Sequence, residues 1–161
     1  MGNRFVISIE DTNENLANKK IDLAIAEISR IEQLFTTFSD DSITNQINAA
    51  AGLTAIEVTA EFLNLVKRAQ GISELTDGAF DLSYGSIDKK LWNFDKTITA
   101  LPTEAAKKNL KLINYKNIIL DEIKNTVYLK EKGMRIGFGG IGKGYAADRA
   151  SLVLKEMGVK N

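Results

Sequence analysis

Apolar residues recur at intervals of three and four positions over residues 14–38, and this spacing predicts one long amphipathic helix. The same period predicts a second helix that begins after Thr59 and a last helix over residues 143–157. We expect the apolar stripe of the first helix to lie in the core; it comprises Leu16, Ile21, Ile25, Ile28, Ile31, Leu34 and Phe35.

Two shorter helices are also expected, one that is capped by Asp41 or Ser42 and runs through Asn48, and one over residues 104–113 that is capped by Thr103. Short runs rich in β-branched and aromatic residues predict strands at 4–10, 56–58, 117–121, 126–130 and 134–137. Short turns separate the last three strands, which predicts an antiparallel meander. This pattern favours an α+β fold with helices packed on a mostly antiparallel sheet.

The composition narrows the chemistry. The chain has 161 residues, with 21 Lys and Arg against 21 Asp and Glu, so its formal net charge is zero and argues against nonspecific nucleic-acid binding. It has no cysteine and no histidine, which excludes thiolate metal sites, cysteine nucleophiles and the Ser-His-Asp triad. No apolar run is long enough to form a transmembrane segment. Any chemistry therefore uses carboxylates, lysines, hydroxyls, the backbone or a hard metal ion.

Five glycines fall within eight residues in the segment GFGGIGKG, residues 137–144. Because glycine has no Cβ, we expect this segment to let the backbone approach a ligand closely and to adopt positive φ angles. Lys143 stands where the glycines give way to the last predicted helix. Bare amides, a cation and a helix start together indicate an anion site, most naturally for phosphate.

Two nucleotide-binding patterns match this segment in part. Gly137, Gly139 and Gly142 fit G-x-G-x-x-G, but the Rossmann fingerprint also needs a βαβ unit and an acidic residue about 20 positions further on. We expect the chain to end before such a unit closes. Residues 137–143 fit G-x-x-x-x-G-K, yet Gly144 stands where the Walker motif has the Ser or Thr that holds Mg²⁺. A glycine-rich turn without a ligand is the remaining alternative.

Four blocks of sequence, in order, resemble those of the ApbE family of FAD:protein FMN transferases. Residues 1–3 (MGN) resemble its Met-Gly-Thr opening, and residues 35–43 (FTTFSDDSI), followed by Asn48, resemble its Ser-Thr-Tyr-x-x-x-Ser segment. Residues 76–81 (TDGAFD) are similar to Thr-x-Gly-Ala-x-Asp, and residues 139–148 (GGIGKGYAAD) to Gly-Gly-Ile-Ala-Lys-Gly-Tyr-Ala-x-Asp. The blocks are spread over the whole chain, which makes the resemblance specific.

The resemblance implies a flavin transferase that moves FMN from FAD to a Ser or Thr hydroxyl of a target protein, with Mg²⁺ required and AMP released. No catalytic side chain is assigned. The backbone carbonyl of Ala146 would be a Mg²⁺ ligand, and a carbonyl oxygen suits this hard cation. The expected partners are FAD and the acceptor protein, and the expected location is the bacterial cell envelope, with the cytoplasm as the alternative. The residues that would contact FAD are Met1, Phe38, Ala79, Phe80, Asp81 and Lys143.

The chain departs from the family pattern in three ways. Phe38 stands where a tyrosine is usual, and Asn3 replaces a threonine. The second half of the family's sequence, which supplies Asp and Thr metal ligands, has no counterpart in these 161 residues. We therefore expect residues 1–161 to be a single ApbE-like domain that is incomplete at its C-terminus, binds flavin weakly and is inactive or nearly so. The alternatives are a noncatalytic FAD- or nucleotide-binding module and a Walker-type hydrolase, which Gly144 disfavours.

Overall fold

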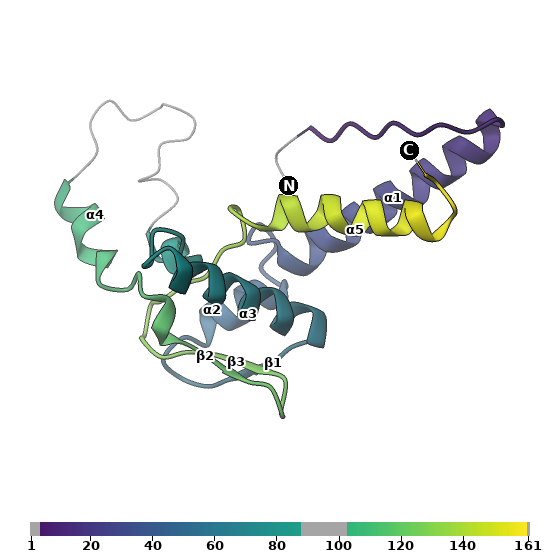
Figure 1. Cartoon of the computed structure of the whole chain (residues 1–161). Coiled ribbons are helices and arrows are strands. Elements are labelled where there is room, and N and C mark those ends of the chain that lie inside the picture. The colour runs from purple at the N-terminus through teal and green to yellow at the C-terminus, as the bar shows by residue number, and fades with distance from the viewer. Residues whose placement is uncertain (1–3, 88–102, 161) are drawn as a thin grey trace.

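The computed structural model describes residues 4–87 and 103–160. Its helices are α1 (Glu14–Phe35), α2 (Ile43–Ala49), α3 (Ala60–Leu75), α4 (Thr103–Leu110) and α5 (Gly142–Glu156). Its strands are β1 (Ile56–Glu57), β2 (Ile118–Asp121) and β3 (Thr126–Leu129), and two short 3₁₀ helices are η1 (Leu82–Ser86) and η3 (Tyr115–Asn117). The long helices α1 and α5 lie side by side, and α2 and α3 cover one face of the small sheet (Figure 1).

The sheet is antiparallel throughout, in the order β1-β3-β2. Val127 of β3 lies between Ile56 of β1 and Leu120 of β2, which fixes the register of all three strands. The predicted α+β class is therefore confirmed. The predicted meander is wrong in one strand, because the third strand of the sheet is β1 and not residues 134–137.

Residues 134–137 do not join the sheet and form no strand. The side chain of Asn48 bonds both backbone groups of Ile136: its Oδ1 accepts the N–H at 2.7 Å and its Nδ2 donates to the C=O at 3.1 Å. Ser86 Oγ accepts the N–H of Arg135 at 2.9 Å, and the N–H of Gly137 donates to the carbonyl of Leu82 at 3.0 Å. The predicted strand is absent because side chains and a 3₁₀ helix satisfy this backbone.

Residues 4–10 are a second correction. Their exposure alternates from residue to residue as in a strand, but no backbone hydrogen bond joins residues 4–9 to another described segment. The predicted strand at 4–10 is therefore wrong. An alternating sequence favours a strand, but a strand also needs a hydrogen-bonded neighbour.

The helix starts follow the capping residues in the sequence. Ser42 Oγ accepts the N–H of Asn45 at the start of α2, and Thr59 Oγ1 accepts the N–H of Phe62 at the start of α3, which confirms both predicted caps. Several predicted boundaries shift: α4 ends at Leu110 instead of residue 113, and α5 begins and ends one residue earlier than predicted. Helix α1 ends at Phe35, since the next residue, Thr36, is already extended, and Thr103 is the first residue of α4 instead of its cap.

Three phenylalanines form the centre of the core. Phe35 of α1, Phe62 of α3 and Phe138 have ring centroids 4.6 to 5.2 Å apart, and all three side chains are buried. Phe138 belongs to the glycine-rich segment, defined as residues 137–144. The cluster therefore ties this segment to the helices on either side of it.

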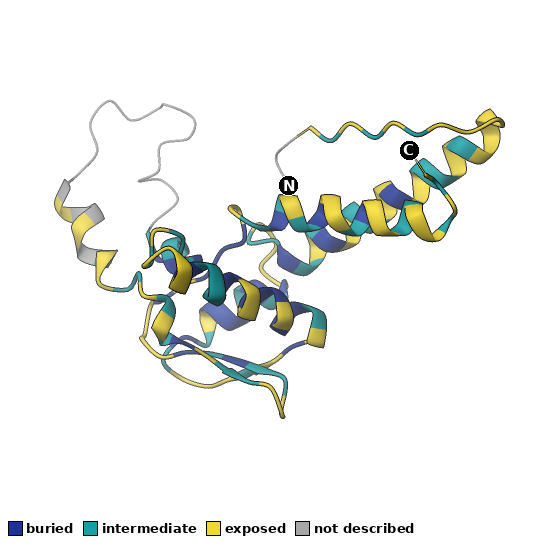
Figure 2. Ribbon diagram, viewed as in Figure 1, coloured by how far each residue is buried: buried dark blue, intermediate teal, exposed yellow. Residues whose placement is uncertain are grey.

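The predicted core stripe of α1 is only partly buried. Ile31 and Phe35 lie in the core, but Leu16 is 49% exposed and Ile25 is 48% exposed. Figure 2 shows the reason: the first half of α1 extends away from the sheet and from α2 and α3. The element that α1 contacts most is α5. Helical periodicity shows that a helix has an apolar face, but not whether another element covers it.

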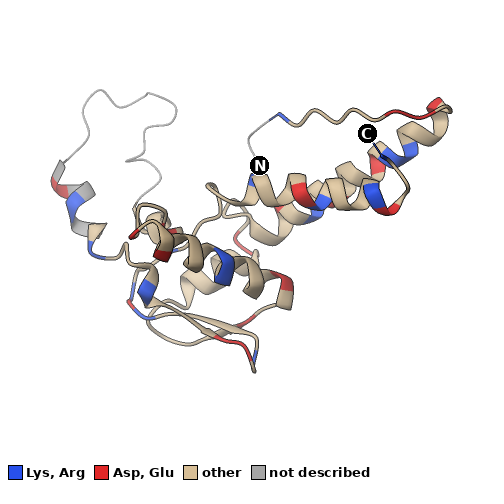
Figure 3. Ribbon diagram, viewed as in Figure 1, with Lys and Arg blue, Asp and Glu red and all other residues tan. Residues whose placement is uncertain are grey.

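A charged cluster joins α1, α3 and α5. Arg30 of α1 donates to Glu27 and to Glu61 of α3, with N–O distances of 2.7 to 2.9 Å. Arg149 of α5 donates to Glu27 at 2.9 Å. Basic and acidic residues are interspersed along the α1–α5 pair (Figure 3). Glu27 thus links α1 to α5, and Glu61 links α3 to α1. These ion pairs hold α5 in position.

We expect Phe62→Ala to lower the free energy of unfolding by about 3–5 kcal/mol, because it removes a fully buried ring from the aromatic cluster. Chemical denaturation monitored by circular dichroism measures this change. The matched control is Leu75→Ala in the same helix, whose side chain is 88% exposed, and it should change stability by less than about 0.5 kcal/mol. Equal effects of the two substitutions would contradict the assignment of the core.

The charged cluster also predicts a pH dependence. Hydrogen bonds from Arg30, and then from Arg149, lower the pKa of Glu27 from 4.5 to about 2. The unfolded chain therefore binds this proton at a higher pH than the folded protein does, so the stabilisation is complete above pH 4.5 and is lost as the pH falls toward 2. Denaturation curves across this range should show a smaller pH dependence for Glu27→Gln, whereas Glu131→Gln, an exposed turn residue, should match the unmodified protein.

Candidate functional site

The glycine-rich segment lies against the turn formed by residues 76–81. A Cβ atom built on Gly140 would be 3.1 Å from Cε2 of Phe80, so the ring occupies the space beside the bare backbone. The N–H of Gly137 also donates a hydrogen bond to the carbonyl of Leu82, the residue that follows this turn. Two of the sequence blocks, separated by about 60 residues, therefore form one surface.

The glycines serve close packing and not positive φ angles. Gly137, Gly139, Gly140 and Gly142 all have ordinary φ values, which corrects the expectation for this segment. A Cβ on Gly139 would lie 2.7 Å from the Tyr84 hydroxyl, and one on Gly142 would lie 3.4 Å from Phe138 Cβ. Apart from its chain neighbours and the backbone of its own helix, no atom of the described residues lies within 4 Å of the position of a Cβ on Gly144, so among these residues the far end of the segment is open.

Lys143 lies in the first turn of α5, as predicted. Its Nζ donates to the carbonyl of Gly139 at 2.6 Å, which folds the side chain back over the glycine-rich segment. Helix α5 has no side-chain cap, and no described residue accepts a hydrogen bond from the backbone N–H groups of Lys143 and Gly144. A cation and two unpartnered amides at a helix N-terminus make this the most anion-attracting point of the segment.

Asp81 has a structural role in this fold. Its Oδ1 accepts the backbone N–H and the hydroxyl of Ser83, at 2.7 and 2.6 Å, and its Oδ2 accepts the N–H of Tyr115 at 2.8 Å. The carboxylate therefore caps η1 and joins it to η3. Ala79, two residues earlier, is exposed at the same turn. Contact of either residue with FAD stays a prediction.

Phe38 is 86% exposed in the loop between α1 and α2. It follows Phe35 by three residues, and the ring of Phe35 lies 4.6 Å from that of Phe138 and 5.8 Å from that of Tyr145. The loop therefore begins beside the glycine-rich segment and offers an aromatic face to solvent. Met1, the other residue predicted to contact FAD, lies outside the described residues.

The described residues do not form a magnesium site by themselves. Ala146 is fully buried, in the second turn of α5, where a main-chain carbonyl normally accepts the helical hydrogen bond from the residue four positions later. Within residues 4–87 and 103–160 there is no group of three or more Asp, Glu, His or Cys side chains able to hold a metal ion. A Mg²⁺ site at Ala146 would need further oxygen ligands.

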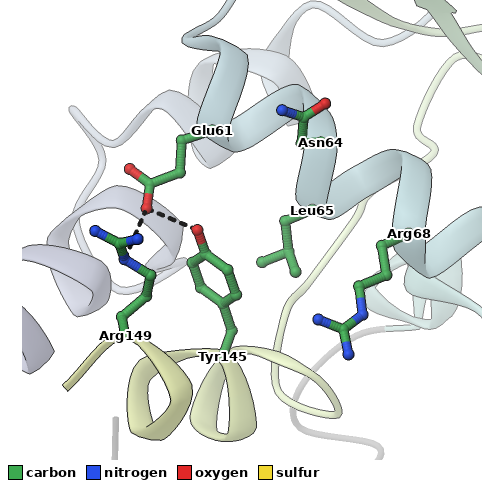
Figure 4. A pocket seen from close by; sticks show the side chains of 6 residues that line it. All are labelled: Glu61, Asn64, Leu65, Arg68, Tyr145 and Arg149. Carbon is green, nitrogen blue, oxygen red and sulfur yellow. Dashed lines mark hydrogen bonds and ion pairs between the residues drawn. The ribbon is translucent and has the colours of Figure 1, made fainter. Parts of the chain in front are cut away.

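A pocket of about 470 Å³ lies on the α3 side of α5 (Figure 4) and is lined by Glu61, Asn64, Leu65, Arg68, Tyr145 and Arg149. The Tyr145 hydroxyl donates to Glu61 at 2.7 Å. Burial, and then this hydrogen bond, raises the pKa of Tyr145 to about 12, so the phenol keeps its proton. None of the residues predicted to contact FAD lines this pocket. We therefore assign its hydrogen bond between Tyr145 and Glu61 to the packing of α5 on α3, and not to the phosphate site.

Tyr84 belongs to the site, although no pattern in the sequence indicates it. Its hydroxyl accepts a hydrogen bond from the backbone N–H of Gly139 at 3.1 Å. Tyr84 lies outside the recognised blocks, and neither periodicity nor spacing distinguishes it from a packing residue. Only the approach of η1 to the glycine-rich segment, 55 residues further along the chain, reveals the contact.

Comparison with known proteins extends this picture. The chain is 32% identical to an FAD:protein FMN transferase of Klebsiella pneumoniae, over 99% of this chain and 49% of the relative. It is 31% identical to one of Treponema pallidum, over 73% of this chain and 34% of the relative. The chain thus spans about half the length, or less, of the curated relatives it matches.

No described helix has both the length and the apolar character needed to cross a bilayer.

Solved structures agree with the fold. A crystal structure of the ApbE protein of Thermotoga maritima matches with a TM-score of 0.81 and 30% identity, over 92% of this chain and 48% of that one. The flavinyl transferase ApbE of Pseudomonas stutzeri has the same fold, with a TM-score of 0.76 and 22% identity, over 89% of this chain and 48% of that one. The ApbE family model matches residues 1–161. The chain therefore belongs to the ApbE family.

Proposed function

We propose that this chain forms the FAD-binding portion of an FAD:protein FMN transferase. In the proposed reaction, the oxygen of a Ser or Thr hydroxyl on the acceptor protein bonds to the phosphorus of the FMN half of FAD. The bond from that phosphorus to the bridging oxygen breaks, the hydroxyl loses its proton, and AMP leaves. The relatives named FAD:protein FMN transferase support this activity, and the cell envelope stays our proposed location for the protein.

The observation that carries the proposal is the N-terminus of α5. The diphosphate bridge of FAD is anionic, and Lys143 together with the N–H groups of Lys143 and Gly144 would offset its charge. The glycine-rich segment allows this approach because, within residues 4–87 and 103–160 and apart from its chain neighbours, no side chain lies within 4 Å of the position of a Cβ on Gly144. Phosphoryl-type transfer depends on positioning and charge stabilisation more than on covalent help, so a site without histidine or cysteine is adequate.

The surrounding aromatic side chains suit the two ring systems of FAD. Phe38 presents an exposed ring that can stack on a flat heterocycle, and its lack of a hydroxyl does not affect stacking. Phe80 is half-buried against Gly140, so a second aromatic ring lies beside the glycine-rich segment. Asp81 caps the neighbouring turn, and its proposed contact with FAD is compatible with this role because Oδ2 accepts only one hydrogen bond, from the N–H of Tyr115.

A noncatalytic FAD-binding module is the second candidate. It needs no metal ion, whereas the transferase needs Mg²⁺, and the described residues hold no group of three or more Asp or Glu side chains placed to bind one. In the transferase proposal, Mg²⁺ is a requirement of the whole reaction, and its remaining ligands lie outside the described residues. The two candidates predict the same FAD site and differ only in whether transfer follows binding.

We expect Lys143→Ala to weaken FAD binding about tenfold or more, because it removes a charge-assisted contact to the diphosphate. Flavin fluorescence titration measures the dissociation constant, and circular dichroism checks that the fold is retained. Lys155→Ala, at the opposite end of the same helix, is the matched control and should leave the affinity unchanged. FAD binding that is indifferent to Lys143 would rule out the proposed phosphate site.

We further expect this chain alone to transfer little or no FMN, even when FAD, Mg²⁺ and an acceptor protein are supplied. The measurement is in-gel fluorescence of covalently bound flavin, with a curated relative such as the Klebsiella pneumoniae enzyme as the positive control. Robust transfer by the 161-residue chain would show that the described residues and their neighbours in this sequence suffice for the metal chemistry.

A further inference from the structure

Gly139 is held on both sides by side chains. Its N–H donates to the Tyr84 hydroxyl at 3.1 Å, and its carbonyl accepts from Lys143 Nζ at 2.6 Å. The first contact comes from η1 and the second from α5. These two hydrogen bonds, which we call the Gly139 clamp, fix the middle of the glycine-rich segment.

The Tyr84 hydroxyl fits closely into this segment. It would lie 2.7 Å from a Cβ on Gly139 and 3.2 Å from a Cβ on Gly137, so it occupies space that only glycine leaves free at these positions. Two glycines of the segment are thus explained by packing against one oxygen atom. The hydroxyl is part of the shape of the turn and not an incidental neighbour.

Helix η1 holds Tyr84 rigidly. Asp81 caps the helix, the N–H of Gly137 donates to the carbonyl of Leu82, and a Cβ on Gly85 would lie 3.0 Å from the backbone of Ile136. The backbone on both sides of Tyr84 is therefore packed along residues 136–139. A hydrogen bond from such a support orders the Gly139 amide at little additional entropic cost.

An incoming anion affects the two hydrogen bonds of the clamp differently. Lys143 is a cation bonded to a neutral carbonyl, and a phosphate oxygen is a better acceptor for it because both partners are then charged. The Tyr84 hydroxyl accepts the Gly139 N–H and has no comparable reason to leave it. A bound diphosphate would therefore release one half of the clamp and keep the other.

We propose that Tyr84 is a positioning residue for the phosphate site, and that Lys143 exchanges the Gly139 carbonyl for a phosphate oxygen when a dinucleotide diphosphate binds. Tyr84 keeps the glycine-rich segment in its binding shape while Lys143 moves. The ligand in this inference rests on the proposed function, whereas the clamp in the free protein does not.

The first test uses Tyr84→Phe, which removes only the hydroxyl, and Tyr128→Phe on β3 as the matched control. Amide hydrogen exchange of the free chain, resolved by NMR, should be about fivefold faster or more at Gly139 in Tyr84→Phe and unchanged there in Tyr128→Phe, as expected for the loss of one neutral hydrogen bond. Unchanged exchange at Gly139 in Tyr84→Phe would overturn the positioning role, whether or not FAD binds.

The second test adds FAD. Tyr84→Phe should raise the dissociation constant about fivefold, without the larger loss expected for Lys143→Ala, and Tyr128→Phe should not change it. In the unmodified chain, the ¹³C shift of the Gly139 carbonyl should move on FAD binding as Lys143 leaves. A static carbonyl shift with FAD bound, or equal affinities of Tyr84→Phe and the unmodified chain, would overturn the inference. Failure of the unmodified chain to bind FAD would instead overturn the proposed function, and the exchange measurement would still decide the clamp.

Discussion

The backbone of residues 134–138 is held by side chains from distant parts of the chain, and the position of the candidate site depends on this. Asn48 satisfies both backbone groups of Ile136, and Ser86 and Leu82 bond the residues on either side. Met134, Ile136 and Phe138 are buried, so alternate side chains anchor the same stretch in the core. Unsatisfied backbone groups are costly in a buried position, and these contacts are therefore specific and mutually dependent.

This anchoring determines the geometry that follows. Phe138 joins the aromatic cluster, and the next residues turn into α5 with their glycines packed against Tyr84 and Phe80. The charged cluster around Glu27 and the hydrogen bond from Tyr145 to Glu61 hold α5 from the opposite side. The N-terminus of α5, with Lys143 and its unpartnered amides, is thus fixed by packing on one side and by ion pairs on the other. Such preorganisation is what an anion site needs if it is to act without rearrangement of the backbone.

The sequence predicts the features that depend on local chemistry. Ser42 and Thr59 mark helix starts because a capping side chain acts within three residues, and Lys143 is placed correctly because glycine and helix signals adjoin. Contacts across long separations escape such reasoning. The partner of Asn48 lies 88 residues away, so the pattern of residues 134–137 predicts a strand where side chains replace the ladder. Likewise, the exposure of Leu16 and the contact of Tyr84 with Gly139 depend on which elements meet, which periodicity does not encode.

The proposed function requires that the glycine-rich segment and the N-terminus of α5 bind a diphosphate. The most direct measurement is an amide chemical-shift map of the ¹⁵N-labelled chain titrated with FAD and, separately, with inorganic pyrophosphate. Both ligands should shift the amides of Gly139, Lys143 and Gly144 most strongly, and FAD alone should extend the effect to Phe38 and Phe80. Shifts centred on Asn64 and Arg68 in the pocket behind α5, with the glycine-rich segment unperturbed, would contradict it.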